Sequence, residues 1–265
     1  MTLAQALAAR RRQGRAGFVP FLMAGDPSLA HTASLARRLA AAGADILELG
    51  VPFSDPVADG PVIQASSQRA LRSGATLSKV LAVAARLKKD GFAPPIVLFT
   101  YLNPVLALGV ERFAGRCRDA GISGVLAVDL PVEEAALLSA PLARRGVEPV
   151  LLASPTTSAR RLELIGKATG SVLYYVCRRG VTGARRGLPE GLPARLREVR
   201  RRSGKPLLVG FGVSGAEQAR ALAPHADGVV VGSALVELSG KPRACETLSR
   251  RIISGLGAGA RLKTR

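Results

Sequence analysis

The chain has 265 residues, of which 48% are hydrophobic, and this is enough for one large domain with a well-filled core. No apolar run reaches the roughly 20 residues of a membrane-spanning helix, and residues 1–20 lack the apolar core of a signal peptide. Three scattered cysteines and two histidines exclude a disulfide framework and a histidine-rich metal site, and they indicate a reducing compartment, the cytoplasm.

The charge is strongly basic, with 38 Lys and Arg against 19 Asp and Glu and a net charge of +19. Such an excess raises the possibility of nucleic-acid binding, because basic side chains neutralise phosphates and release counterions. The basic residues are spread along the chain, however, and no aromatic residues are interleaved with them. We therefore expect a non-specific affinity for polyanions and no nucleic-acid function beyond it.

Short apolar runs alternate with longer amphipathic segments from the start of the chain to its end. Eight runs rich in Val, Ile and Leu predict strands over residues 17–23, 45–51, 95–101, 124–130, 147–153, 171–176, 206–212 and 227–233. Amphipathic segments predict helices over residues 28–44, 61–74, 76–91, 103–121, 131–146, 158–170, 192–204, 214–226 and 241–257. Near-continuous apolar strands are typical of parallel sheets that are buried on both faces.

This alternation predicts an α/β fold. Eight strand–helix units in about 250 residues favour a (β/α)8 TIM barrel with extra short helices over a doubly wound sheet, which usually has fewer strands. We predict a single domain over residues 1–265, because no linker rich in Pro, Gly and Ser divides the chain. Residues 255–265 are rich in glycine and basic residues and are expected to form a frayed basic tail.

Two acidic residues lie where such a barrel forms its active site, at the carboxyl ends of the strands and in the loops that follow. Glu48 interrupts the apolar run 45–51, and Asp59 follows in the loop beyond it. Desolvation raises the pKa of a carboxyl on a strand, whereas a loop carboxylate nearer water stays ionised, and such a pair can move protons on one substrate. The alternatives are a buried ion pair between Glu48 and an arginine, and a turn or helix-cap role for Asp59.

Glycine-bearing loops follow the last three predicted strands, at residues 178–187, 210–215 and 231–237. Glycine lets the backbone approach a ligand closely, and helix amino termini favour anions, so these loops predict a phosphate site. The segment 177–189 is long for a connection between a strand and a helix. It predicts either a lid that closes over the barrel opening or a disordered surface loop, with Thr182 as its only hydroxyl.

Eight stretches that occur in order make the chain resemble the tryptophan synthase alpha subunit over nearly its whole length. The most specific are "LELGVPFSDPVADGPVIQ" (47–64) and "YYVCRRGVTGARRGLP" (174–189). The others lie at residues 20–27, 99–113, 124–134, 154–165, 209–219 and 226–237. The +19 charge departs from the family, whose members are usually acidic or near neutral, and this puts the usual partner surface in doubt.

The resemblance implies a lyase of tryptophan biosynthesis. Such an enzyme cleaves indole-3-glycerol phosphate to indole and glyceraldehyde 3-phosphate by acid–base catalysis of a retro-aldol reaction, without a metal or an organic cofactor. It also implies a partner, the pyridoxal-phosphate-dependent beta subunit, in an alpha2-beta2 heterotetramer. A stand-alone lyase that releases free indole, and a non-catalytic partner or regulator of a beta subunit, remain open as alternatives.

The resemblance also implies site residues by position. Glu48 would protonate indole C3, and Asp59 would accept a hydrogen bond from the indole N–H. Residues in or near the wall of the indole site would be Phe21, Tyr101, Leu126, Ala127, Asp129 and Tyr174. The phosphate and lid positions would be Thr182, Gly183, Gly212, Gly232 and Ser233. The contacts with the beta subunit would include Pro52, Asp55, Asn103 and Pro104.

Overall fold

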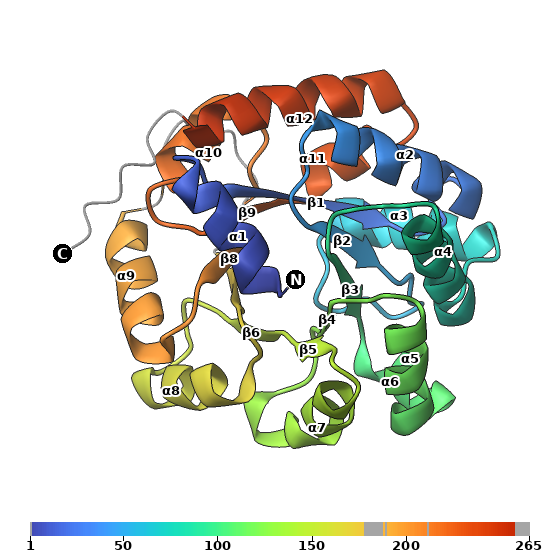
Figure 1. Ribbon diagram of the computed structural model, residues 1–265, viewed down its shortest axis with the longest axis horizontal. Helices are drawn as coiled ribbons and strands as arrows, with labels where there is room; N and C mark the ends of the chain where they lie inside the picture. The colour runs from blue at the N-terminus through green and yellow to red at the C-terminus, as the bar shows by residue number, and fades with distance from the viewer. Residues whose placement is uncertain (1, 178–187, 189, 211, 258–265) are drawn as a thin grey trace.

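Parallel strands form the centre of the computed structural model, which describes residues 2–177, 188, 190–210 and 212–257. The strands are β1 (Gly17–Met23), β2 (Leu47–Gly50), β3 (Ile96–Thr100), β4 (Gly124–Ala127), β5 (Glu148–Pro149), β6 (Leu151–Ala153), β7 (Leu173–Val176), β8 (Leu207–Gly210) and β9 (Gly228–Val231). Their order in the sheet is β5-β4-β3-β2-β1-β9-β8-β7-β6. Helices surround this ring of strands, which confirms the predicted TIM barrel (Figure 1).

The predicted strand over 147–153 is divided in two. Pro149 has no N–H to donate, and Val150, whose own N–H donates to the carbonyl of Val125 (2.8 Å), lies between the two pieces. The first piece, β5, pairs with β4, and the second piece, β6, pairs with β7. This segment therefore joins the two edges of the sheet and closes the barrel.

Twelve α-helices and one 3-10 helix lie in the described part of the chain. They are α1 (Leu3–Arg12), α2 (Leu29–Ala42), α3 (Pro61–Arg72), α4 (Leu77–Lys89), α5 (Leu102–Leu108), α6 (Val110–Asp119), η1 (Val132–Glu134), α7 (Ala136–Arg144), α8 (Ala159–Ala168), α9 (Leu192–Ser203), α10 (Ala216–Leu222), α11 (Ser233–Val236) and α12 (Pro242–Gly257). Side-chain oxygens of Ser28, Thr76 and Ser158 accept backbone N–H groups and begin three of these helices.

Two helix predictions and the start of the predicted tail differ from the structure. The helix expected over 131–146 is divided into η1 and α7. The helix expected over 103–121 is divided into α5 and α6 at Gly109. Its φ is +87°, a backbone conformation that glycine adopts at little cost in free energy. Residues 255–257, expected to begin a frayed tail, are instead the last residues of α12, where Gly255 and Leu256 are buried. Residues 258–265 lie outside the described residues.

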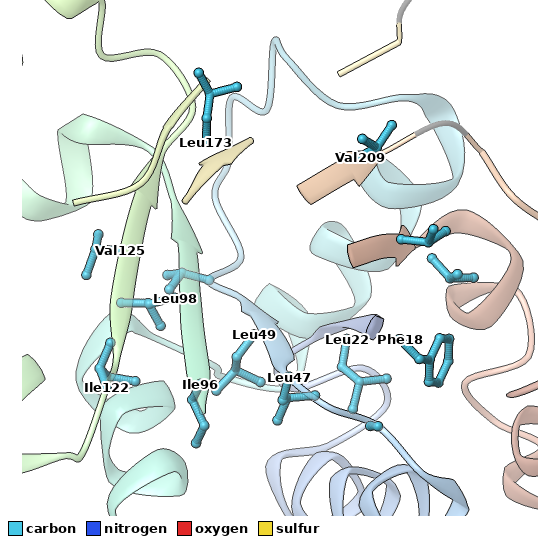
Figure 2. Close-up of a cluster of buried hydrophobic side chains, with 14 of the residues drawn as sticks. Phe18, Leu22, Leu47, Leu49, Ile96, Leu98, Ile122, Val125, Leu173 and Val209 are labelled. Carbon is cyan, nitrogen blue, oxygen red and sulfur yellow. The ribbon is translucent and has the colours of Figure 1, made fainter. Parts of the chain in front are cut away.

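Two layers of apolar side chains hold the barrel together. Alternate strand residues point outward and pack under the helices, as Leu47, Leu49 and Leu98 do in Figure 2. The other residues fill the interior together with Leu3 and Leu7 of α1, which crosses one end of the barrel (Figure 1). Each fully buried Leu or Phe stabilises the fold by about 1.5–3 kcal/mol relative to an exposed one.

The position of α1 leaves the other end of the barrel for the site. The carboxylate of Glu148, on β5, accepts the backbone N–H groups of Leu3 (2.9 Å) and Ser171 (2.8 Å), and so fixes the start of α1 where the strands begin. All strands are parallel, so their carboxyl ends meet at the opposite end. In the described part of the chain, no helix is both long enough and apolar enough to cross a membrane.

Candidate active site

Glu48 faces the interior of the barrel from the middle of β2. Its Cα is in register with those of Phe21 on β1 and Val97 on β3. Because side chains alternate along a strand, Ile46 and Glu48 point inward while Leu49 packs outward under the helices. The strand therefore places a carboxyl group, only 1% exposed, inside an otherwise apolar barrel.

The surroundings of Glu48 favour its protonated form. Burial, and to a lesser extent the nearby charge of Asp59, raise the pKa of Glu48 to about 8. The hydroxyl of Tyr174 donates to Oε2 over a long 3.4 Å, which opposes the rise in pKa. Oε1 has no hydrogen-bond partner among the described residues. Glu48 thus carries a proton at neutral pH that it can give to a bound molecule.

Asp59 is held in the β2–α3 loop by contacts with a second strand end. Its N–H donates to the carbonyl of Pro56 (3.0 Å), and the N–H of Ala58 donates to the hydroxyl oxygen of Tyr101 (3.0 Å). The ring of Phe53 lies 5.1 Å from the Tyr101 ring, measured between centroids. Burial raises the pKa of Tyr101, and the charge of Asp59 and its hydrogen bond with the hydroxyl raise it further. Tyr101 therefore ties the Asp59 loop to the end of β3.

Glu48, Asp59 and Tyr174 act on one another across the barrel opening. Burial raises the pKa of Tyr174, and the charges of Glu48 and Asp59 add to this effect. No arginine of the described chain forms an ion pair with Glu48, and the amino terminus of α3 is capped by Gly60 and not by the Asp59 side chain. The arrangement therefore fits an acid–base pair and disfavours the ion pair of Glu48 and the helix-cap role of Asp59, whereas the backbone of Asp59 does take part in a turn.

Aromatic and aliphatic side chains surround Glu48 on the inner face of the barrel. Phe21, Leu126 and Tyr174 all lie on inward positions, as expected for walls of the indole site. The rings of Phe21 and Phe99 meet edge to face with their centroids 5.4 Å apart. Phe99 was not among the sequence candidates, although its place two residues after the inward Val97 was a signal that could have found it.

Two of the expected wall residues lie elsewhere. Ala127 follows Leu126 directly, so it points outward and belongs to the cluster between strands and helices, which corrects the expectation. Asp129 is exposed, and its carboxylate accepts the N–H of Leu102 (2.8 Å) at the start of α5. Its place is therefore at the rim, where it orders the β3–α5 turn.

Two turns that could hold an anion follow β8 and β9. Gly212 has a φ of +73° and precedes α10, and Gly232 precedes Ser233, the first residue of α11. The amino termini of α10 and α11 have no side-chain cap among the described residues, so backbone N–H groups there are available to a ligand. Thr182 and Gly183, the other predicted members of this site, lie outside the described residues, as does all of 178–187.

The residues expected to contact a partner lie on the β2–α3 loop and on the first turn of α5. Phe53 and Tyr101 join these segments through their rings, and Asp55 and Asn103 are exposed beside them. Pro104 is partly buried, and Pro52 is buried, so Pro52 supports the loop rather than offering contact area.

Two large apolar side chains are exposed at the same rim. Val57, in the β2–α3 loop, is 79% exposed, and Leu106, on α5, is 49% exposed. Exposed apolar side chains can form part of a surface that another protein covers. The part of the chain that the structure describes contains no group of three or more His, Cys, Asp or Glu side chains that could bind a metal ion.

Comparison with known sequences identifies relatives over most of the chain. The family model described as tryptophan synthase alpha chain matches residues 7–253. The tryptophan synthase alpha chain of Burkholderia multivorans is 46% identical over 234 residues, which are 88% of this chain and 86% of the relative. That of Synechococcus elongatus is 47% identical over 235 residues, 88% of each chain.

Solved structures show the same architecture. The tryptophan synthase subunit alpha of Legionella pneumophila has a TM-score of 0.88 and 37% identity, with 97% of this chain and 98% of that chain covered. A structure of Mycobacterium tuberculosis tryptophan synthase has a TM-score of 0.90 and 32% identity, with coverage of 97% and 99%. The resemblance stated from the sequence motifs is therefore confirmed.

Proposed function

The chain belongs to the tryptophan synthase alpha chain family, lyases that act on indole-3-glycerol phosphate in tryptophan biosynthesis, and we propose that Glu48 and Asp59 carry its reaction. The observation that supports this most strongly is the buried carboxyl of Glu48. It faces the barrel opening with its pKa raised to about 8, within the field of Asp59. A neutral acid beside an ionised one is what protonation of a carbon atom requires.

The cleavage is a retro-aldol reaction in which Glu48 both gives and takes a proton. Glu48 protonates indole C3, which leaves the ring with a positive charge and Glu48 as a carboxylate. Glu48 then removes the proton of the hydroxyl group on the carbon attached to C3. That oxygen forms a carbonyl, the carbon–carbon bond breaks, and its electron pair returns to the indole ring. Indole and glyceraldehyde 3-phosphate are released, and Glu48 has its proton again.

Asp59 stabilises the charged ring between these two proton transfers. Its carboxylate accepts a hydrogen bond from the indole N–H. The acidity of this N–H rises as the ring becomes positive, so the hydrogen bond strengthens toward the transition state. Tyr101 is hydrogen-bonded to Asp59 and holds its loop to β3. The inward aromatic rings of Phe21 and Tyr174 offer a flat apolar surface to the indole ring.

The phosphate group is assigned to the turns after β8 and β9, and only β1 separates β9 from β2 in the sheet. Gly212 lies in the turn before α10, and Gly232 and Ser233 lie at the start of α11, where no side chain caps the helix. The family resemblance adds Thr182 and Gly183 to this set. Placing the phosphate there directs the indole end of the substrate toward Glu48 and Asp59 on β2 and its loop.

Alpha chains of this family pair with a beta subunit, and we assign the partner surface of this chain to the rim formed by the β2–α3 loop and α5. Asp55, Asn103 and Pro104 lie there, and the exposed Val57 and Leu106 supply apolar area. An alpha2-beta2 heterotetramer is the proposed assembly.

The free thiols of all three cysteines support the proposal that the protein works in the cytoplasm.

Indole release tests the role of Glu48. We expect the wild-type chain alone to release indole slowly from indole-3-glycerol phosphate, and a beta subunit to accelerate it. Glu48→Gln, which keeps the shape of the side chain, should lower the rate by about 10²–10⁴-fold, because it can neither give nor take the proton. The exposed Glu133→Gln is the matched control and should retain wild-type activity. Equal rates for Glu48→Gln and wild type would remove Glu48 from the mechanism.

A further inference from the structure

Basic side chains gather at the end of the barrel that lies opposite the candidate active site. Arginine or lysine occupies the last turn of α1, α4, α6, α7, α8, α9 and α10. The helices that follow the strands run back along the barrel, so their carboxyl ends lie where the strands begin. Cations at these positions stabilise the helices through the helix dipole. They also concentrate positive charge on one end of the molecule.

The charge is densest where α1, α9 and α10 end together. Arg11 of α1 lies 3.4 Å from Asp227, and Arg200 of α9 lies 2.6 Å from the same carboxylate. Arg11 also donates to the carbonyl of Ala223 (3.1 Å), directly after α10. These contacts link Arg11 of α1 and Arg200 of α9 through Asp227, and link Arg11 to the chain directly after α10.

The three helices that meet here also carry four further arginines, and we call Arg12 of α1, Arg197 and Arg201 of α9, and Arg220 of α10 the cationic face. All four side chains are exposed. The stretch 192–205 carries six basic residues and a single acid, Glu198. Burial lowers the pKa of the neighbouring His225, and the charges of Arg197 and Arg11 lower it further, which shows that positive potential extends across the junction.

The acid at the centre of the junction does not neutralise these arginines. The Asp227 side chain is only 12% exposed and is engaged by Arg11 and Arg200 from inside the junction. Its Oδ2 also accepts the N–H of Leu207 (2.7 Å) at the start of β8. The cationic face therefore meets the solvent with its charge largely uncompensated.

We propose that the cationic face binds the phosphate backbone of nucleic acid, without regard to base sequence. Planar guanidinium groups form paired hydrogen bonds with phosphate oxygens, and the four residues are all arginines. The exposed large apolar residues among those described are Val57, Leu106, Leu137 and Leu164, and none of them is on α1, α9 or α10. The face thus offers nothing to stack on bases or to insert into a membrane, and its recognition is electrostatic.

Nucleic acid bound at this face leaves the barrel opening free. Asp227 immediately precedes β9, whereas Gly232 comes directly after it at the other end of the strand. A strand advances about 3.3 Å per residue, so four strand residues alone separate the two ends by roughly 13 Å. The lyase site and the nucleic-acid face are therefore independent, and each can be tested without the other.

Fluorescence anisotropy with a labelled 20-base-pair DNA duplex tests the proposal. Binding to the wild-type chain should weaken as NaCl is raised, with a slope of about −0.9 in log K against log salt for each phosphate neutralised. In the triple variant Arg12→Gln/Arg201→Gln/Arg220→Gln, the slope of log K against log salt should be less negative than in the wild type by about 2–3. Its binding at 50 mM NaCl should be weaker by a factor of at least about ten. Two duplexes of unrelated sequence should bind equally well.

The matched control removes three exposed arginines from the first turns of helices, at the other end of the barrel. Arg112→Gln/Arg160→Gln/Arg243→Gln has the same net charge as the test variant and should bind the duplex within about twofold of wild type. Equal losses in both triple variants would overturn the proposal, because net charge alone would then explain binding. No binding at 50 mM NaCl, or binding of phosphatidylglycerol vesicles in place of DNA, would also overturn it.

Indole release measured with saturating duplex separates this proposal from the lyase assignment. We expect the rate to stay unchanged when DNA is bound, since the cationic face lies away from the opening. Inhibition by DNA that the substrate relieves would place the polyanion at the phosphate turns and would contradict the proposed face. Loss of lyase activity in Glu48→Gln with normal DNA binding would leave the two conclusions independent.

Discussion

At the scale of single residues, the buried carboxyl of Glu48 makes the reaction depend on pH. Its pKa of about 8 lies well above that of an ordinary glutamate, so the proton it donates is present at neutral pH and is lost as the pH rises through about 8. We expect kcat/KM for indole release to be level near pH 7 and to fall about tenfold per pH unit well above pH 8. A series of initial-rate measurements across this range provides the check.

Tyr174→Phe tests the cause of that pH dependence. The Tyr174 hydroxyl donates to Glu48 and lowers its pKa, so removal of the hydroxyl should raise that pKa and move the alkaline decline to higher pH. Tyr175→Phe is the control, because the Tyr175 ring packs outward between strands and helices. An alkaline decline at the same pH in Tyr174→Phe and wild type would show that the 3.4 Å bond does not tune Glu48.

Residues differ in how far the sequence could specify their roles. Glu48 was predictable because a carboxyl in an apolar strand is costly unless it is used. Alternation along β4 separates Leu126 from Ala127, but it assigns a face only when the strand's register is known. The bond between Tyr174 and Glu48 joins residues 126 positions apart, and only closure of the barrel brings them together.

At the scale of elements, hydrophobic patterns located nearly every strand, and the errors came from single backbone groups. The apolar pattern of residues 147–153 predicts one strand, yet the strand is divided at Val150, directly after Pro149, which has no N–H to donate. Residues 103–121 read as one amphipathic helix, yet Gly109 turns the chain between α5 and α6. Both breaks lie at Pro or Gly, which marked the positions without indicating that the element would be interrupted.

The packing of α12 on α10 provides a prediction at this scale. A Cβ added at Gly255 would lie 2.3 Å from the carbonyl oxygen of Ala216, a backbone atom that cannot move without the helix. Gly255→Ala should therefore lower the free energy of unfolding by about 1–2 kcal/mol, because overpacking outweighs the better helix propensity of alanine. Urea titration followed by circular dichroism would measure the loss.

A control for this prediction lies on the same helix. Gly257 has nothing within 4 Å of an added Cβ, so Gly257→Ala should leave the free energy of unfolding unchanged or raise it slightly. If Gly255→Ala is as stable as Gly257→Ala, then α10 and α12 can separate at little cost. The close contact would then not be what fixes the position of α12 on the barrel.

At the scale of the whole molecule, the acidic residues are too few to balance the charge. Several of the 19 acids form ion pairs on the surface, where each pair contributes roughly 0–1 kcal/mol. Asp45 is an exception, because its buried carboxylate accepts two hydrogen bonds from Arg15 (2.6 and 3.0 Å) and one from the N–H of Phe18 (2.8 Å). Repulsion among the remaining cations therefore opposes the compact state.

This balance predicts that moderate salt stabilises the protein. Raising NaCl from about 10 mM to about 150 mM shortens the Debye length from about 30 Å to about 8 Å, which screens repulsion across the surface more than it weakens close ion pairs. We expect the Tm to rise by roughly 2–4 °C, which corresponds to about 1 kcal/mol for a chain of this size. Arg112→Gln/Arg160→Gln/Arg243→Gln removes three charges from +19 and leaves +16, so its Tm should respond less to NaCl. A Tm that falls as NaCl is added would mean that the surface ion pairs outweigh the repulsion.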